Sequence, residues 1–194
     1  KESLKVAILC KTKTPWGEDN TGCNAFGHNA VKKLIALGRC PKCILSGVDL
    51  SGKNLKSANL SQADLSGANL FKANLKNANL ADSNLSNGNV AGVNLSGANL
   101  NGADLRGVNL SGSDLKYAKL KRADLRGANL NGADLRKANF FGADLRNAKL
   151  EWTKLRGANL SEANLTDAVI KFEINDNLDI AILCKTKTSS GEKS

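Results

Sequence analysis

Aromatic residues, proline, methionine and histidine are scarce in this sequence of 194 residues. Aromatic side chains make up 4% of the chain, which also holds two prolines, one histidine and no methionine, although 41% of it is apolar. Any core must therefore be built from small and medium side chains, mainly Ala and Leu. The aromatic rings are also too few for a surface that stacks successive nucleic-acid bases.

Long hydrophobic runs and common catalytic motifs are missing as well. No apolar run approaches the roughly 18 residues that a membrane span requires. The segment 4–10 resembles the apolar region of a signal peptide or a lipid-anchor site, but it is short and Leu9 stands where a small residue should precede the cysteine, so we interpret it as a buried strand. The sequence contains no phosphate-binding loop, no G-x-S-x-G motif and no paired histidines. We therefore predict neither an enzyme nor a cofactor.

Acidic residues are too few to balance the basic ones. The chain has 28 Lys and Arg residues against 18 Asp and Glu residues, which gives a formal net charge of +10. A balance of this sign argues against an acidic surface and is compatible with anionic partners. Solubility is the simpler explanation of the charge, and we favour it.

What the sequence has in abundance is a repeat of five residues. From Cys43 to Ile170 the register never slips over 26 units, and the typical unit reads Ala-(Asn or Asp)-Leu-x-x. Successive residues of an extended chain point to opposite sides, so Ala and Leu should point inward and Asn or Asp outward. The other two residues must turn the chain. Gly occupies the second of these positions 12 times, as a type II turn favours.

Charged residues recur at multiples of 20, which suggests that four pentapeptides form one coil. Parallel coils would then stack about 4.8 Å apart, and the repeats would make about six and a half coils. Lys53 stands where a small inward residue belongs, so it should disturb the first coil or project outward near its open end. Lys119, Lys149 and Lys154 replace the outward Asn or Asp without a cost in packing. The residues that recur every 20 positions are Asp104, Asp124 and Asp144 with Arg106, Arg126 and Arg146.

This pattern resembles the pentapeptide-repeat family, whose motif A-(D/N)-L-x-x is matched from about Cys43 to Ile170. The resemblance implies an all-β solenoid, namely a right-handed quadrilateral parallel β-helix, and the count of four pentapeptides to a coil rests partly on it. Some members resemble duplex DNA and bind type II topoisomerases, but the positive charge of this chain argues against mimicry of DNA. The resemblance also suggests an extracytoplasmic location, in the periplasm or the thylakoid lumen.

The chain divides into four segments. We assign 1–23 to a strand and hairpin, 24–42 to a capping helix with a C-x-x-C motif, and 43–171 to the β-helix. We assign 172–194 to a C-terminal strand or tail that repeats the N-terminal element.

Both ends of the solenoid need covering. Apolar residues at helical spacing before Gly38 predict an amphipathic helix that caps the first coil, with Gly38 as its stop. We interpret His28, at the start of this helix, as a cap or surface residue and not as a metal ligand. The segment 6–18 returns as 180–192 with 10 of 13 positions identical. We therefore expect the chain to be either one unit of a longer tandem protein or a trimmed form.

The five cysteines include one local pair. Cys10 and Cys23 flank a Pro-Trp-Gly turn signal and are predicted to close a hairpin by a disulfide. Cys40 and Cys43 fit a local disulfide, half of a zinc site completed by Cys10 and Cys23, or a redox pair. We favour the disulfide, because a redox pair should begin a helix and this pair follows one. Disulfides would indicate an oxidising compartment. Cys184 is left over, and a partner outside this chain is one interpretation.

The outer faces are where any partner must bind. Basic residues spaced by 20 form a strip that is either an anion-binding face or simply a solvated face, and we favour the second. Trp152 and Phe172 lie 20 positions apart, so their rings should stack as a contact or a cap near the C-terminal end. We expect an unidentified protein partner or self-association through the solenoid ends, and we disfavour nucleic acid. The basic strip comprises Lys56, Lys76, Lys116, Arg136, Lys137 and Arg156.

Overall fold

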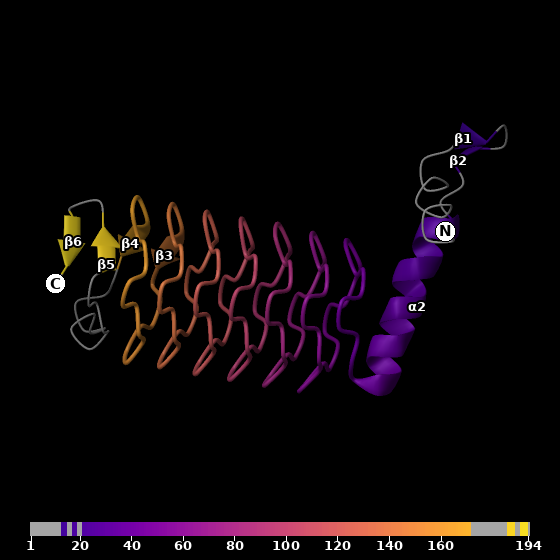
Figure 1. Cartoon of the computed structure of the whole chain (residues 1–194), viewed down its shortest axis with the longest axis horizontal. Helices are drawn as coiled ribbons and strands as arrows, with labels where there is room; N and C mark the ends of the chain where they lie inside the picture. Colours follow the sequence, from indigo (N-terminus) through magenta and orange to yellow (C-terminus); the bar gives the residue numbers. More distant parts are fainter. Residues whose placement is uncertain (1–12, 15–16, 19–20, 172–185, 189–190, 194) are drawn as a thin grey trace.

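The computed structural model describes residues 13–14, 17–18, 21–171, 186–188 and 191–193, with side chains of the helix described from Asn29 onward. A stack of coils forms the body of the molecule, with helix α2 at one end and the hairpin of β5 and β6 at the other (Figure 1). Among the described residues, no helix is long and apolar enough to cross a membrane. The elements are β1 (Lys13–Thr14), β2 (Gly17–Glu18), α2 (Thr21–Leu37), β3 (Lys149–Glu151), β4 (Val169–Lys171), β5 (Thr186–Thr188) and β6 (Gly191–Lys193).

Each coil contains 20 residues, as the spacing of the charged residues predicted. Parallel bridges join each outward residue to the residue 20 positions later, from Arg39 and Asn59 through to Asp144 and Asn164. Strands β3 and β4 continue the same register. In a typical coil the Leu65 N–H donates to the Asn84 carbonyl over 2.7 Å. Because almost every side is hydrogen-bonded to the coils before and after it, the stack behaves as one continuous sheet wrapped into a tube.

The corners are type II turns. The carbonyl of nearly every central residue accepts a hydrogen bond from the N–H three residues later, as from Ala68 to Leu65 over 3.0 Å. The second turn residue has a positive φ at all 26 corners, of which 12 are Gly and 14 are not. The left-handed conformation costs a residue with a side chain about 1 kcal/mol. The hydrogen bonds of the stack offset that cost, because 12 of these 14 corners also donate a backbone hydrogen bond to the next coil.

The interior is filled by two kinds of side chain. Leu occupies the central position of nearly every unit, Phe140 takes its place once, and Ala fills most of the second inward position; almost all are fully buried. Three buried polar residues, Ser83, Ser113 and Thr153, stand at Ala positions. Their hydroxyls donate to backbone carbonyls over 2.7–2.9 Å, so none is left without a hydrogen bond. Lys53 was expected either to disturb the first coil or to project outward; it is exposed, as the second alternative predicts.

The N-terminal end is capped by α2, and the β-helix begins earlier than expected. Leu34 is fully buried, and the Gly38 N–H donates to the Leu34 carbonyl over 2.8 Å with a positive φ at Gly38, which confirms the predicted helix stop. Helix α2 starts at Thr21 and not at Asn24. Cys40 already occupies a central, fully buried position, since Arg39 bridges to Asn59.

The duplicated end segments form equivalent hairpins. Lys13 pairs with Glu18 in the first, and Lys187 pairs with Glu192 in the second, at the position 174 residues later. Cys10, Phe172 and Cys184 lie outside the described residues, as do the side chains of Cys23 and His28. The Cys10–Cys23 disulfide therefore stays a prediction.

Candidate functional site

The outward Asn and Asp side chains hold the corners in place. In most units the Oδ1 atom accepts a hydrogen bond from the backbone N–H two residues later, as Asn69 does from Phe71 over 3.2 Å. The Asn amide group also donates one coil back, from Asn69 to Asp49 over 3.0 Å and from Asn89 to Asn69 over 3.2 Å. These side chains are therefore structural. The alternation of residues predicts only that they point outward, although the preference of Asn and Asp for positions just before a turn is a usable signal.

Lysine can replace this residue because a neighbouring coil supplies the missing acceptor. Lys119 has no side-chain oxygen, and the Lys121 N–H instead donates to Asn101 Oδ1 over 2.9 Å. The same exchange follows Lys149, where the Glu151 N–H donates to Asn131 Oδ1 over 3.0 Å. The substitution thus changes the hydrogen bonding of the corner, whereas the expectation from the sequence concerned packing alone.

One face of the tube is a zipper of paired charges. Arg106 donates to Asp104 through two nitrogens over 2.6 and 2.8 Å, and its Nε lies 3.8 Å from Asp124 on the next coil. The side-chain hydrogen bond from Arg106 lowers the pKa of Asp104, and the same bond raises the pKa of Arg106. Each cation here is matched by a carboxylate, so this face offers little free charge. We call it the zipper face; it comprises Asp104, Arg106, Asp124, Arg126, Asp144 and Arg146.

The predicted basic strip is continuous only in its C-terminal half. Lys56 and Lys76 are exposed on the same corner column, but Ser96 separates them from the rest. A hollow of about 430 Å³ opens where the later members stack on consecutive coils. Its lining residues are Lys116, Tyr117, Arg136, Lys137, Arg156 and Gly157.

The cations around this hollow differ in their pairing. Lys116 Nζ lies 3.3 Å from Asp114, and Arg136 lies 2.7 Å from Asp134. Partial burial by itself would raise the pKa of Asp134, but the hydrogen bonds from Arg136 bring it below its ordinary value. Arg156 follows Lys154 and not an Asp, and it has no ion-pair partner among the described residues.

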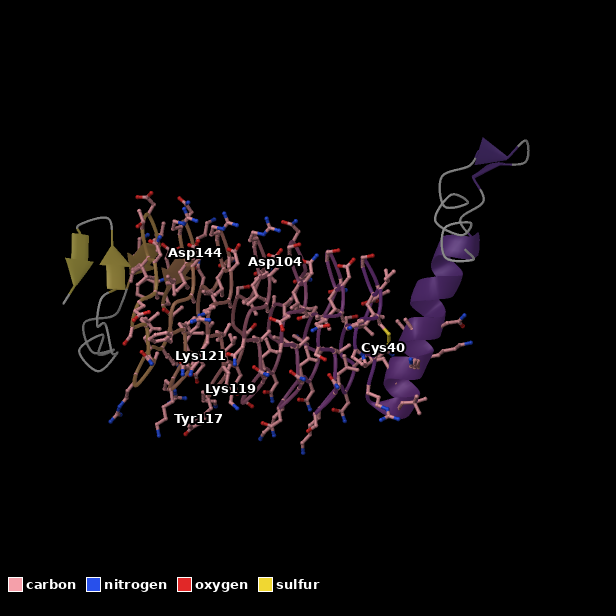
Figure 2. All side chains as sticks on the ribbon, viewed as in Figure 1. Cys40, Asp104, Tyr117, Lys119, Lys121 and Asp144 are labelled. Atoms are coloured by element: carbon pink, nitrogen blue, oxygen red, sulfur yellow. A yellow bond between two sulfur atoms is a disulfide. The ribbon has the colours of Figure 1, made fainter. Side chains whose placement is uncertain are left out.

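Three basic residues that the strip did not include extend this surface around the next side of the tube. Lys119, Lys121 and Arg122 are exposed, and bridges stack Lys119 on Asn139. In Figure 2, Tyr117, Lys119 and Lys121 lie on the lower side of the stack, away from Asp104 and Asp144. We define the basic face as residues 116–122, 136–142 and 156–162. The basic strip does not include these three residues because it follows only one set of positions spaced by 20. Their signal in the sequence is that they stand at neighbouring outward positions of the same coil.

Trp152 lies at a corner near the C-terminal end and is 56% exposed. Its backbone N–H donates to the Lys171 carbonyl over 2.8 Å, and Lys171 Nζ lies 2.6 Å from the Glu151 carboxylate. The ring of Trp152 is thus available for contact. The predicted stack with Phe172 falls outside the described residues and stays a prediction.

Cys40 and Cys43 form a disulfide, as predicted. They occupy the central position and the following inward position on either side of one corner, so their Cα atoms lie 5.4 Å apart, within the usual range for a disulfide. Cys40 Sγ also lies 3.6 Å from the Ala30 carbonyl oxygen of α2. No cluster of three or more metal-binding side chains occurs among the described residues.

A four-sided parallel coil of pentapeptides, with Leu and Ala inside and Asn or Asp outside, defines a class of solenoid. A family model described as "Pentapeptide repeats" matches eight copies, over residues 42–70, 73–112, 109–147, 118–157 and 143–172. The matched residues cover more than half of the chain, and the chain belongs to the pentapeptide-repeat family, whose members fold as right-handed quadrilateral β-helices.

Solved structures of pentapeptide-repeat proteins are similar to parts of this chain. HetL, involved in heterocyst differentiation regulation in the cyanobacterium Nostoc, is 35% identical over 80% of this chain and 74% of its own, with a TM-score of 0.37. A protein of the Arabidopsis thaliana thylakoid lumen is 29% identical over 52% of this chain and 68% of its own, with a TM-score of 0.48. QnrB1, a plasmid-mediated fluoroquinolone resistance protein, is 24% identical over 77% and 79%, with a TM-score of 0.39. No match was found among curated proteins.

Proposed function

We propose that this chain is a non-enzymatic structural and protein-interaction module, a rod of about six and a half coils at about 4.8 Å each, that binds a partner through its outer faces. One observation carries the proposal. The central Leu residues of the array are at most 6% exposed, and the three buried hydroxyls already bond to the backbone. The interior formed by the described residues thus offers no reactive group, and we therefore place recognition on the outer faces and the ends.

The Cys40–Cys43 disulfide supports a location in an oxidising compartment outside the cytoplasm, such as the periplasm or the thylakoid lumen. The equivalent hairpins at the two ends support the proposal that the chain is one unit of a tandem array. Peptide mass mapping of protein purified without reductant tests whether the disulfide forms, and with it the proposed oxidising compartment. A free thiol at Cys43 would contradict it.

A second candidate function is the binding of a polyanion, because the basic face carries seven basic residues and one acidic residue, Glu162. Mimicry of duplex DNA is disfavoured, since a mimic needs acidic faces and this chain has a formal net charge of +10. The relation to QnrB1 does not alter this choice.

Photo-crosslinking at each of the four corners tests the proposed function. A photoreactive amino acid replaces Tyr117, Arg122, Asn147 or Trp152, one in each variant, and each variant is irradiated in extract of the source organism. All four positions are exposed and each lies on a different corner. A protein-interaction module should give an adduct at one corner, or at two adjacent ones, that excess unmodified chain displaces. The absence of any displaceable adduct at all four corners would contradict the proposal.

A further inference from the structure

We infer that the basic face is the docking surface for an acidic segment of a protein partner, with the hollow beside Tyr117 as its anchoring point. This inference rests on the proposed protein-interaction function and adds the chemistry of the partner. It is carried by three observations, namely the net charge of the face, the unpaired cations within it, and the shape of the hollow.

The basic face concentrates the charge of the chain. Three stacked segments contain four, two and one basic residues and a single Glu, a net charge of +6 on one face of a chain whose total is +10. All of these basic side chains are exposed except Lys116, which is half-buried. A surface of one sign speeds encounter with a partner of opposite sign and rejects partners of the same sign.

Most of these cations form no ion pair with the described residues of the chain. Lys116 and Arg136 are paired with Asp114 and Asp134. The other five, by contrast, have no carboxylate within ion-pair distance among the described residues: Lys119, Lys121, Arg122, Lys137 and Arg156. An unpaired Arg can donate two parallel hydrogen bonds to one carboxylate, so Arg156 is the natural anchor.

A glycine forms one wall of the hollow. Gly157 has a φ of +72°, and a Cβ at this position would lie 3.3 Å from Lys137 Cγ. Lys137 Nζ in turn lies 5.4 Å from the centre of the Tyr117 ring, which is 58% exposed. Tyr and Arg in a partly enclosed site are the residue types that dominate binding energy at protein interfaces.

The pattern of charge favours a protein over a nucleic acid. Asp114 and Asp134 stand beside the same column of cations, so a phosphate backbone would meet carboxylates as well as Lys and Arg. An acidic peptide avoids this repulsion, because its own amide N–H groups and occasional basic side chains can face those carboxylates. Tyr117 is the one strongly exposed aromatic ring on this face, and Lys137 lies over it, so a strand of bases would find no row of rings to stack on.

The test compares three labelled probes of matched charge: a glutamate-rich peptide, a single-stranded DNA oligonucleotide and a heparin fragment. Binding is measured by fluorescence anisotropy to the full chain and to two triple variants. The first carries Lys121→Glu, Lys137→Glu and Arg156→Glu on the basic face. The control carries Lys56→Glu, Lys72→Glu and Lys76→Glu, which changes the net charge equally on the N-terminal coils. Circular dichroism and thermal unfolding establish that both variants fold.

We expect the peptide to bind the unmodified chain more tightly than either other probe. Its affinity should fall at least about tenfold in the basic-face variant and less than about threefold in the control. A charge-neutralising variant, Lys137→Ser with Arg156→Ser, should bind the peptide about threefold more weakly than the unmodified chain. It replaces the charge-reversed variant in the comparison if that variant does not fold.

Three outcomes would overturn the inference: no binding of the peptide at low salt, tighter binding of the oligonucleotide or heparin, or equal losses in the two triple variants. Photo-crosslinking separates this failure from failure of the proposed function. Adducts confined to Asn147 or Trp152 would end the role of the basic face and leave the interaction module intact. No displaceable adduct at any corner would end both.

Discussion

Single outward side chains determine how the corners of this solenoid are held. An Asn at this position accepts a hydrogen bond from its own corner and donates one to the coil before, as Asn79 does with Ala81 and Asn59 over 3.2 and 3.4 Å. Asn79 also accepts from Asn99 over 3.1 Å. These amides therefore form a ladder of hydrogen bonds that joins successive coils on the outside of the tube, where no hydrophobic packing holds them together.

Removing one rung should destabilise the fold measurably. Asn79→Ala leaves the Ala81 N–H and the Asn99 amide without their acceptor, so we expect the free energy of unfolding to fall by about 1–2 kcal/mol. Lys119→Ala, at an equivalent rung with no side-chain acceptor, is the control and should change stability by less than about 0.5 kcal/mol. Chemical denaturation measures both. Equal losses would show that the ladder contributes nothing.

The zipper face should make stability depend on acid. Hydrogen bonds from Arg106 lower the pKa of Asp104; at Asp144 burial opposes the shift, but Arg146 still lowers the pKa. A carboxylate with a lowered pKa contributes stability that is present above its ordinary pKa and is lost as the pH falls through the folded-state value. The melting temperature should therefore drop as the pH falls below about 4, and Arg106→Gln with Arg146→Gln should make that drop shallower. An unchanged pH profile in the double variant would refute the assignment.

At the scale of the elements, backbone conformation restricts the second residue of each corner: 12 corners hold Gly, and none of the other 14 holds a β-branched residue. Gly127 has a φ of +66°, and a Cβ added there would have no heavy atom within 4 Å. Space is therefore not what restricts the residue at this corner. The backbone conformation alone decides which side chains are tolerated.

Two substitutions at Gly127 isolate this effect. Gly127→Asn should be nearly neutral, because Asn already occupies corners such as Asn77 and Asn87 with a positive φ. Gly127→Val should lower the free energy of unfolding by about 1–2 kcal/mol, since a β-branched residue is poorly suited to the left-handed region. Denaturation midpoints distinguish the two. A loss from Asn as large as that from Val would mean that size, and not φ, restricts the corner.

The Cys40–Cys43 disulfide closes the first corner of the β-helix, next to the N-terminal cap. It links the first buried central position to the next side and touches α2 through the Ala30 carbonyl. Closing so short a loop should contribute about 2 kcal/mol. Cys40→Ala with Cys43→Ala should therefore speed hydrogen exchange at the first corner amides, such as Lys42, while leaving the Lys137 amide near the C-terminal end unaffected. Uniform acceleration along the rod would contradict a local role.

Much of the whole molecule follows from the period of five, and the exceptions have identifiable causes. Alternation assigns Leu and Ala to the interior, and Gly at every other corner or so indicates the turns. Cys40 is missed as the first central residue because Gly38, Arg39 and Cys40 stand in place of Ala-Asn-Leu, although Arg39 and Cys40 keep the outward and inward positions of the coil. Lys119 and Lys121 are missed as part of a binding surface because the basic strip follows only positions spaced by 20. The basic residues of the face instead lie on two neighbouring corners and on the side between them.

We propose that the outside of the tube is the recognition surface of the whole molecule and that recognition falls on the basic face. The most direct measurement is a backbone NMR titration of the full chain with the glutamate-rich peptide. We predict that chemical-shift changes gather on the basic face, at Tyr117, Lys121 and Gly157, and spare Asp104 and Asp124 on the zipper face. Shifts centred on the zipper face, or spread evenly over all four sides, would contradict the account.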